Sequence, residues 1–124
     1  MKWGRYWGST LSETATGIAL DDTERYFYVS GYSDTVGTLS VAKYDMFIIR
    51  FVISTGLINW ARRYGYDSND KANGVYHSGD FVYVVGESDS TGWSSSKTDM
   101  ILLKLDSSTG TLGTNSYAKY IGGT

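Results

Sequence analysis

The chain alternates between short apolar runs and polar stretches rich in Ser, Thr, Asp and Gly. The clearest apolar runs are residues 26–31, 46–53, 81–86 and 100–106. They are rich in Val, Ile, Tyr and Phe, which favour extended structure, and turn-forming residues bound each run. No segment places its apolar residues about every 3.6 positions, as an amphipathic helix would. The pattern therefore predicts an all-β protein.

The same pattern occurs twice and begins a third time. An aromatic–small–basic motif starts at Trp3, Trp60 and Tyr117, each 57 residues after the last. Three further motifs recur in order: Ala-x-Gly at 15–17 and 72–74, Tyr-Val-x-Gly at 28–31 and 83–86, and Asp followed by an apolar run at 45–49 and 99–103. Small differences in spacing fall between the motifs, as expected when folded repeats differ in their loops.

Each repeat is predicted to contain four strands in an antiparallel sheet. We place the repeat units at residues 3–59 and 60–116, with a partial third unit at 117–124, in a single domain or segment that covers residues 1–124. The aromatic motif is the first strand of each unit. The other strands are expected at 15–20, 26–31 and 46–53 in the first unit and at 72–77, 81–86 and 100–106 in the second. Gly17 and Gly74 lie within strands and are expected to mark bulges or close packing.

These motifs resemble the seven-bladed β-propeller repeat (SBBP) over nearly the whole chain. That repeat has a Trp-x-x-x-Tyr-Gly motif, matched here at 60–65, and then motifs matched at 15–19, 28–32 and 45–49. The chain departs from it in one turn, because the family's Asp-Gly-Asn is replaced at 22–25 and 78–80. The resemblance implies β-propeller blades in which the aromatic strand is outermost. It implies no reaction.

Two blades are too few to close a propeller, which contains about 4–8. Open blade faces expose apolar surface that soluble monomers rarely show. We therefore expect adjacent blades of a longer chain, or head-to-tail assembly of copies into a ring or a filament. The chain also carries three outer-strand motifs for two sets of inner strands, and a surplus strand is suited to completing a neighbour's blade. The residues expected in these assembly strands are Trp3, Tyr6, Trp7, Tyr117 and Tyr120.

Composition narrows the range of partners. The 124 residues are 41% hydrophobic and 19% charged, with a net charge of −2, which is typical of a globular protein. No basic field is present to attract nucleic acid, and no apolar run has the length of a membrane helix, so we expect neither partner. The absence of cysteine excludes disulfides and cysteine-bound zinc. It assigns no compartment, and an extracellular or cell-surface location is the favoured expectation.

The sequence contains no recognisable catalytic or metal-binding group. His77 is the only histidine, and a triad or a metal cluster needs partners that a lone histidine lacks, so we expect a structural or surface role. Asp45 and Asp99 recur at equivalent positions and are expected to cap turns by accepting backbone N–H groups. The remaining turn aspartates do not fit a calcium loop, although a looser calcium site is an alternative. We expect no enzyme, no cofactor and no metal.

Unlike the repeated Trp3, Trp60 and Tyr117, Trp93 has no counterpart in the first unit. It lies in the polar stretch 90–97, where the first unit has Thr35, Val36, Gly37 and Thr38. An exposed Trp there suits a binding surface, and the alternative is a Trp folded back on its own blade. Trp93, Asp89 and Lys97 are the predicted contacts for a ligand or partner. The predicted function is a non-enzymatic structural or interaction module, with a carbohydrate-binding, lectin-like oligomer that binds glycans as the alternative.

Overall fold

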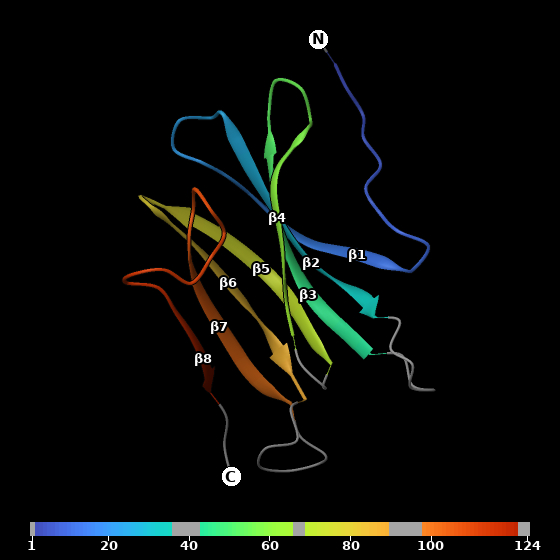
Figure 1. Cartoon of the computed structure of the whole chain (residues 1–124), viewed down its shortest axis with the longest axis vertical. Helices are drawn as coiled ribbons and strands as arrows, with labels where there is room; N and C mark the ends of the chain where they lie inside the picture. Colours follow the sequence, from blue (N-terminus) through green and yellow to red (C-terminus); the bar gives the residue numbers. More distant parts are fainter. Residues whose placement is uncertain (1, 36–42, 66–68, 90–97, 122–124) are drawn as a thin grey trace.

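The computed structural model describes residues 2–35, 43–65, 69–89 and 98–121 (Figure 1). All regular structure in these ranges is β-strand, which confirms the predicted all-β class. The described residues contain no helix long and apolar enough to cross a membrane. The strands are β1 (Glu13–Leu20), β2 (Tyr26–Thr35), β3 (Lys43–Val52), β4 (Ile58–Tyr64), β5 (Asp70–Ser78), β6 (Phe81–Ser88), β7 (Asp99–Asp106) and β8 (Tyr117–Ile121).

The strands form two four-stranded antiparallel sheets, each in simple sequential order. We call β1-β2-β3-β4 blade 1 and β5-β6-β7-β8 blade 2, because the arrangement is consistent with two propeller-like blades. Each blade takes its first three strands from one sequence repeat and its last strand from the next. Trp60 lies in β4, and Tyr117 begins β8. The aromatic motif therefore supplies the outer strand of the preceding blade.

Glycines mark irregularities in the first strand of each blade, as predicted. The pairing of β1 with β2 shifts register between Ala15 and Gly17, and that of β5 with β6 shifts between Ala72 and Gly74. The extra residue sits at the same point in both repeats, which is the pairing pattern of a β-bulge.

The turn-capping aspartates are different from those expected. Asp45 lies inside β3 opposite Ser33, and Asp99 lies in β7 opposite Ser88, so neither occupies a turn. Asp21 and Asp106 have this role instead. The Asp21 carboxylate accepts the backbone N–H of Arg25 at 2.9 Å, and Asp106 accepts the backbone N–H of Ser108 at 2.8 Å. Both aspartates directly follow or end a strand, where backbone donors leave the ladder.

The main core lies between the two blades. Its buried residues alternate along the strands, since alternate side chains of a strand share one face. Blade 1 contributes Tyr28, Met46, Ile48 and Trp60, and blade 2 contributes Ala72, Val82, Val84, Ile101, Leu103 and Leu105. We call this packing the blade joint. A second, smaller cluster of Phe47, Ile49 and Phe51 lies on the other face of blade 1. Blade 1 is thus apolar on both faces.

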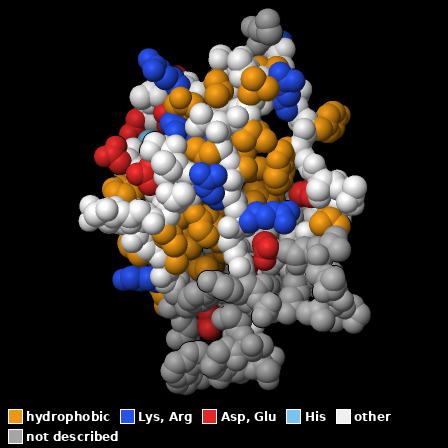
Figure 2. Space-filling model, viewed as in Figure 1, with side chains coloured by type: hydrophobic (Ala, Val, Ile, Leu, Met, Phe, Trp, Pro, Cys, Tyr) orange, Lys and Arg blue, Asp and Glu red, His pale blue; other side chains and the backbone are white. Residues whose placement is uncertain are grey.

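Residues 3–7, the N-terminal segment, belong to neither sheet. The segment has no strand assignment and runs beside blade 1 (Figure 1). Of the three aromatic motifs, two form outer strands and the first has no sheet partner in this chain. Hydrophobic side chains lie at the surface between this segment and the strands (Figure 2). The face of blade 1 beneath it is the candidate functional surface.

Candidate assembly surface

The open face of blade 1 is a row of apolar side chains on its two central strands. Phe27 and Val29 come from β2, and Phe47, Ile49 and Phe51 come from β3. The rings of Phe27 and Phe51 are stacked with their centroids 5.0 Å apart. This face points away from blade 2, because the alternate residues of the same strands form the blade joint.

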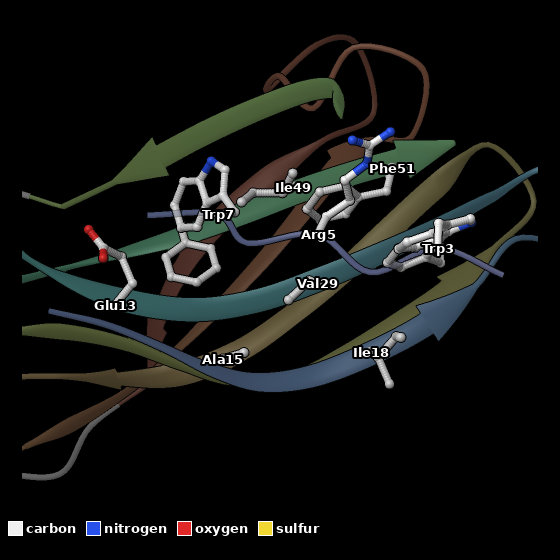
Figure 3. Close-up of a pocket in the computed structure, with 11 residues that line it drawn as sticks. Trp3, Arg5, Trp7, Glu13, Ala15, Ile18, Val29, Ile49 and Phe51 are labelled. Carbon is white, nitrogen blue, oxygen red and sulfur yellow. The ribbon is translucent and has the colours of Figure 1, made fainter. Parts of the chain in front are cut away.

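The N-terminal segment covers part of the open face of blade 1 (Figure 3). The Trp3 ring stacks on Phe27 with centroids 6.0 Å apart, and the Trp7 ring lies 4.8 Å from that of Phe47. A hollow of about 410 Å³ remains between the segment and the strands. Ile18, at the inner edge of this hollow, is 69% exposed. The cover is therefore incomplete, and the half of the face nearest β1 is open.

Trp3 contacts blade 1 as Trp60 contacts blade 2. The Trp3 indole N–H donates to the carbonyl of Ile53 at 2.7 Å, and the Trp60 indole N–H donates to the carbonyl of Ser107 at 3.1 Å. Ile53 and Ser107 are 54 residues apart, which is the spacing of β3 and β7 in the sequence. Trp3 therefore lies where the outer strand of a preceding blade would place its tryptophan.

The turns under the two indoles have the same construction. Gly56 has φ +69° and Gly110 has φ +71°, a left-handed conformation that favours glycine. A β-carbon at Gly56 would lie 2.6 Å from the Trp3 ring, and one at Gly110 would lie 2.6 Å from the Trp60 ring. Both turns therefore need glycine for the backbone and for the indole. A Ser-Thr-Gly triplet recurs at 54–56 and 108–110, before the second and third aromatic motifs, so the sequence itself carried a signal for these turns.

The repeat relates the open face of blade 1 to a face that is covered in this chain. Its five residues align with Val82, Val84, Ile101, Leu103 and Leu105 of blade 2, which blade 1 buries almost completely. The open face of blade 1 is thus the same kind of surface as the blade 2 side of the blade joint, but no second blade packs on it among the described residues.

The other end of the chain presents the complementary surface. The open face of blade 2 consists of Tyr83, Val85, Met100, Leu102 and Lys104, which align with Tyr28, Ser30, Met46, Ile48 and Arg50 of blade 1. Those blade 1 residues face the blade joint, where Tyr28, Met46 and Ile48 are fully buried. Val85 and Met100 are 44% and 47% exposed. The two ends of the chain therefore carry the two halves of the interface found in its middle.

One cation–aromatic contact supports this alignment. The Arg50 guanidinium lies 3.5 Å from the centre of the Tyr26 ring. The Lys104 ammonium lies 4.0 Å from the centre of the Phe81 ring, at the equivalent positions of blade 2. Blade 2 thus has the same local arrangement as blade 1 on a face that has no partner blade in this chain.

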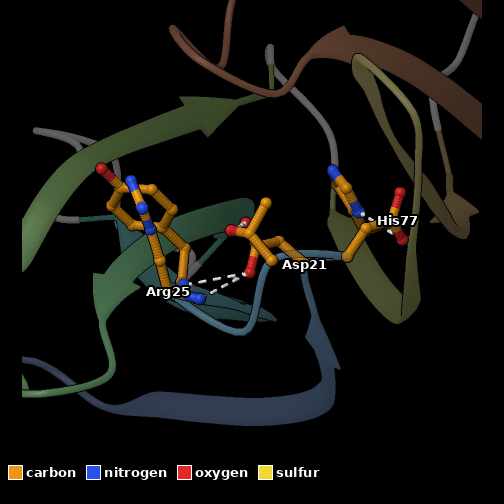
Figure 4. Close-up of polar contacts among 6 residues, drawn as sticks. Asp21, Arg25 and His77 are labelled. Carbon is orange, nitrogen blue, oxygen red and sulfur yellow. Dashed lines mark hydrogen bonds and ion pairs between the residues drawn. The ribbon is translucent and has the colours of Figure 1, made fainter.

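His77 lies in the blade joint. It is buried and stacks on Tyr28, with ring planes 10° apart and centroids at 5.3 Å. Its Nδ1 lies 3.6 Å from a carboxylate oxygen of Asp22 in blade 1 (Figure 4). These contacts assign His77 a structural environment in the blade joint. Among the described residues, no three His, Asp or Glu side chains converge as ligands for a metal ion.

Asp21 stabilises the turn between β1 and β2, next to the blade joint. Burial alone would raise the pKa of the Asp21 carboxyl, but hydrogen bonds from Thr23, Tyr26 and Arg25 outweigh it and hold the pKa below its ordinary value. The carboxylate is therefore the favoured form in the folded chain, as expected of a turn cap rather than a proton donor.

The predicted ligand contacts divide between described and undescribed residues. Trp93 and Lys97 lie outside the described residues. Asp89 is described, and its carboxylate accepts hydrogen bonds from the backbone N–H and the side-chain amide of Asn69, the latter at 2.7 Å. The side-chain oxygen of Asn69 in turn accepts the backbone N–H of Tyr44 at 3.2 Å. Asn69 thus links Asp89 to β3 of blade 1, and the sequence alone did not indicate Asn69 as the partner of Asp89.

The predicted assembly residues have different environments. Trp3 and Trp7 lie on the open face of blade 1, at 39% and 37% exposure, whereas the Tyr6 side chain is fully exposed. Tyr117 is half-buried in β8 opposite Lys104. Tyr120 pairs through its backbone with Ile101. The structure therefore brings Trp3 and Trp7 together on one face and puts the two tyrosines of β8 on another blade.

Comparison with protein-family models finds no match to the chain, and no curated protein matches it. The proposed function therefore rests on the geometry of the two open faces.

Proposed function

We propose that the chain is a non-enzymatic assembly module in which the open face of blade 2 in one copy packs on the open face of blade 1 in the next. The observation that supports this is the equivalence of these faces to the two sides of the blade joint. A second copy is the occupant that matches both faces, because the chain itself contains the joint that they would form.

Such a contact is head-to-tail, so it uses two different surfaces of each copy. Repeated contacts of this kind close into a ring or continue as a filament. Because propellers close with about 4–8 blades, a ring would contain about two to four copies. A longer chain that supplies the adjacent blades would fill the same faces, and the assembly of this chain alone distinguishes the two cases.

The direct test uses one charge on each open face. Ile18→Asp places a carboxylate on the exposed edge of the open face of blade 1, and Val85→Asp does the same on blade 2. Ile18 is 69% exposed and Val85 is 44% exposed, so the single chain should keep its fold. In a joint, the aspartate would be buried without a partner, which costs far more than it does in water.

The expected result is specific to a head-to-tail contact. The unmodified chain should form a discrete multimer or large particles in sedimentation and light scattering, and each variant alone should be a monomer. An equimolar mixture of the two variants should form a dimer and nothing larger, because each variant keeps the face that the other has lost. Leu112→Asp, on the exposed connection 107–116, is the matched control and should assemble normally. A monomeric unmodified chain at all concentrations would refute the proposal.

The alternative of a glycan-binding module has less support from the described aromatic residues. Trp60 is buried in the blade joint, and the Trp3 ring, although 39% exposed, is stacked on Phe27. Binding to a glycan array by the unmodified chain, lost in Trp93→Ala, would favour that alternative.

A further inference from the structure

We infer that, on assembly, β8 of one copy leaves its place beside β7 and the N-terminal segment of a second copy takes that place. The copies are then linked by exchange of an outer strand. The inference rests on the proposed head-to-tail contact and adds which strand completes each blade. The inference follows because β8 of one copy and the N-terminal segment of the next would occupy the same position over Gly56.

The position is defined by the blade joint within the chain. There, β4 pairs with β3 and holds Trp60 over Gly110 of the neighbouring blade. When a second copy packs its blade 2 on the open face of blade 1, β8 should hold Tyr117 over Gly56 in the same way. Trp3 of the receiving copy already lies over that glycine. The two segments overlap, and one of them must leave.

The N-terminal segment is the better anchored of the two at this position. Its Trp3 donates to the carbonyl of Ile53, and Nη2 of Arg5 donates to the carbonyl of Thr55 at 3.2 Å. Trp7 adds the ring contact with Phe47. Displacing the segment would break all of these contacts within the receiving copy, whereas a departing β8 loses backbone pairing that the N-terminal segment can replace.

The replacement keeps the register of the ladder. In blade 1, β3 pairs Arg50 with Trp60 and Ile48 with Arg62. In blade 2, β7 pairs Lys104 with Tyr117 and Leu102 with Lys119. Because the motifs are 57 residues apart, the incoming segment would pair Trp3 with Lys104 and Arg5 with Leu102. The hydrogen bonds to β7 are thus exchanged rather than lost.

Three features make β8 the weaker of the outer strands. It has 5 residues against 7 in β4, and its last residue, Ile121, is 49% exposed. Residues 107–116 connect it to β7, a longer connection than residues 53–57 between β3 and β4. A longer closing loop has a larger entropic cost and allows the strand to leave without disturbing β7.

Engineered disulfides in the full-length chain test this register, since the protein has no cysteine of its own. The pair Arg5→Cys with Leu102→Cys should form disulfides between chains, seen as a ladder on a non-reducing gel. The pair Lys119→Cys with Leu102→Cys should form a disulfide within the chain that becomes less frequent as the protein assembles. Arg5→Cys with Leu103→Cys is the control, because neighbouring residues of β7 point to opposite faces. Cross-linking within one chain by the first pair would overturn the inference.

Matched proline pairs test which strand leaves. Successive amides of a strand point to opposite sides, so two adjacent prolines remove a ladder donor whichever way the strand faces. Ala118→Pro with Lys119→Pro weakens β8, and Gly4→Pro with Arg5→Pro weakens the N-terminal segment at the equivalent positions. We expect the first variant to assemble at a concentration about tenfold lower than the unmodified chain, and the second at one about tenfold higher, since one or two hydrogen bonds change an equilibrium constant by about this factor.

Each other outcome has a definite meaning. Opposite shifts would mean that β8 stays and the N-terminal segment leaves, and no shift in either variant would mean that the copies meet without strand exchange. Both results overturn the inference but leave the proposed function intact. If neither the unmodified chain nor any variant assembles, the proposed function itself is wrong.

Discussion

Replacement of Trp60 by alanine should destabilise the folded chain more than any other single truncation in the blade joint. The side chain is only 7% exposed, its ring lies 6.0 Å from that of Tyr28, and its N–H donates to the carbonyl of Ser107. Truncating a buried Trp costs about 3–5 kcal/mol. A domain of this length has a total stability of about 6–19 kcal/mol at about 0.05–0.15 kcal/mol per residue. The loss is therefore a large fraction of the free energy of unfolding.

Trp3 supplies the matched comparison, because it makes the same type of contact on the other blade. It is 39% exposed, against 7% for Trp60, so it buries about two thirds as much of its side chain. It also lies in a segment without ladder hydrogen bonds. We expect Trp3→Ala to cost about 1–2 kcal/mol in the single chain, less than half the cost at Trp60.

Urea unfolding followed by far-ultraviolet circular dichroism measures both losses. The experiment should be made at a concentration where the chain is monomeric, and the slope of unfolding free energy against urea should not change. Leu112→Ala, on an exposed connection, serves as the control and should stay within about 0.5 kcal/mol of the unmodified chain. A cost below about 1 kcal/mol at Trp60, or a larger cost at Trp3 than at Trp60, would refute the reasoning that ranks these indoles by burial.

Two further predictions concern the turns. Gly110→Ala should cost about 2 kcal/mol or more, because it combines a left-handed backbone with a close approach to the Trp60 ring. Gly79→Ala, at φ +59° with no atom near the new β-carbon, should show the backbone cost alone, and equal losses in urea unfolding would contradict the role of the indole. Hydrogen bonds from Ser108, through its side chain and its backbone, hold the pKa of Asp106 below its ordinary value. Asp106 therefore adds stability above its unfolded pKa of about 3.9 that is lost as the pH falls through the lower folded pKa. Asp106→Asn should flatten the decline of stability in acid, and an unchanged pH profile would show that these hydrogen bonds have no effect.

The amino-acid sequence was sufficient to predict the elements of this fold. Short apolar runs such as 81–86, which are rich in β-branched and aromatic residues and bounded by turn-forming residues, predict strands, and the two-residue period of a strand places alternate side chains on one face. The spacing of Trp60 and Tyr117 placed an outer strand after each set of three inner strands, and the excess of outer-strand motifs over sheets showed that residues 3–7 would lack one. These features depend on neighbouring residues or on the repeat, so local sequence carries them.

The tertiary structure decided what lies against each face. The two-residue period of a strand puts Phe47, Ile49 and Phe51 on one side of β3, but it does not indicate that Phe27 shares that face or that Trp3 and Trp7 cover it. The recurrence of Asp45 predicted a turn cap, whereas the structure puts Asp45 within β3 and shows turn capping at Asp21 and Asp106. The pairing of Asp89 with Asn69 joins segments that lie 20 residues apart, and the stacking of His77 on Tyr28 joins the two blades. Such contacts depend on strand pairing and sheet packing, which bring together residues that are far apart in the chain and that no local pattern connects.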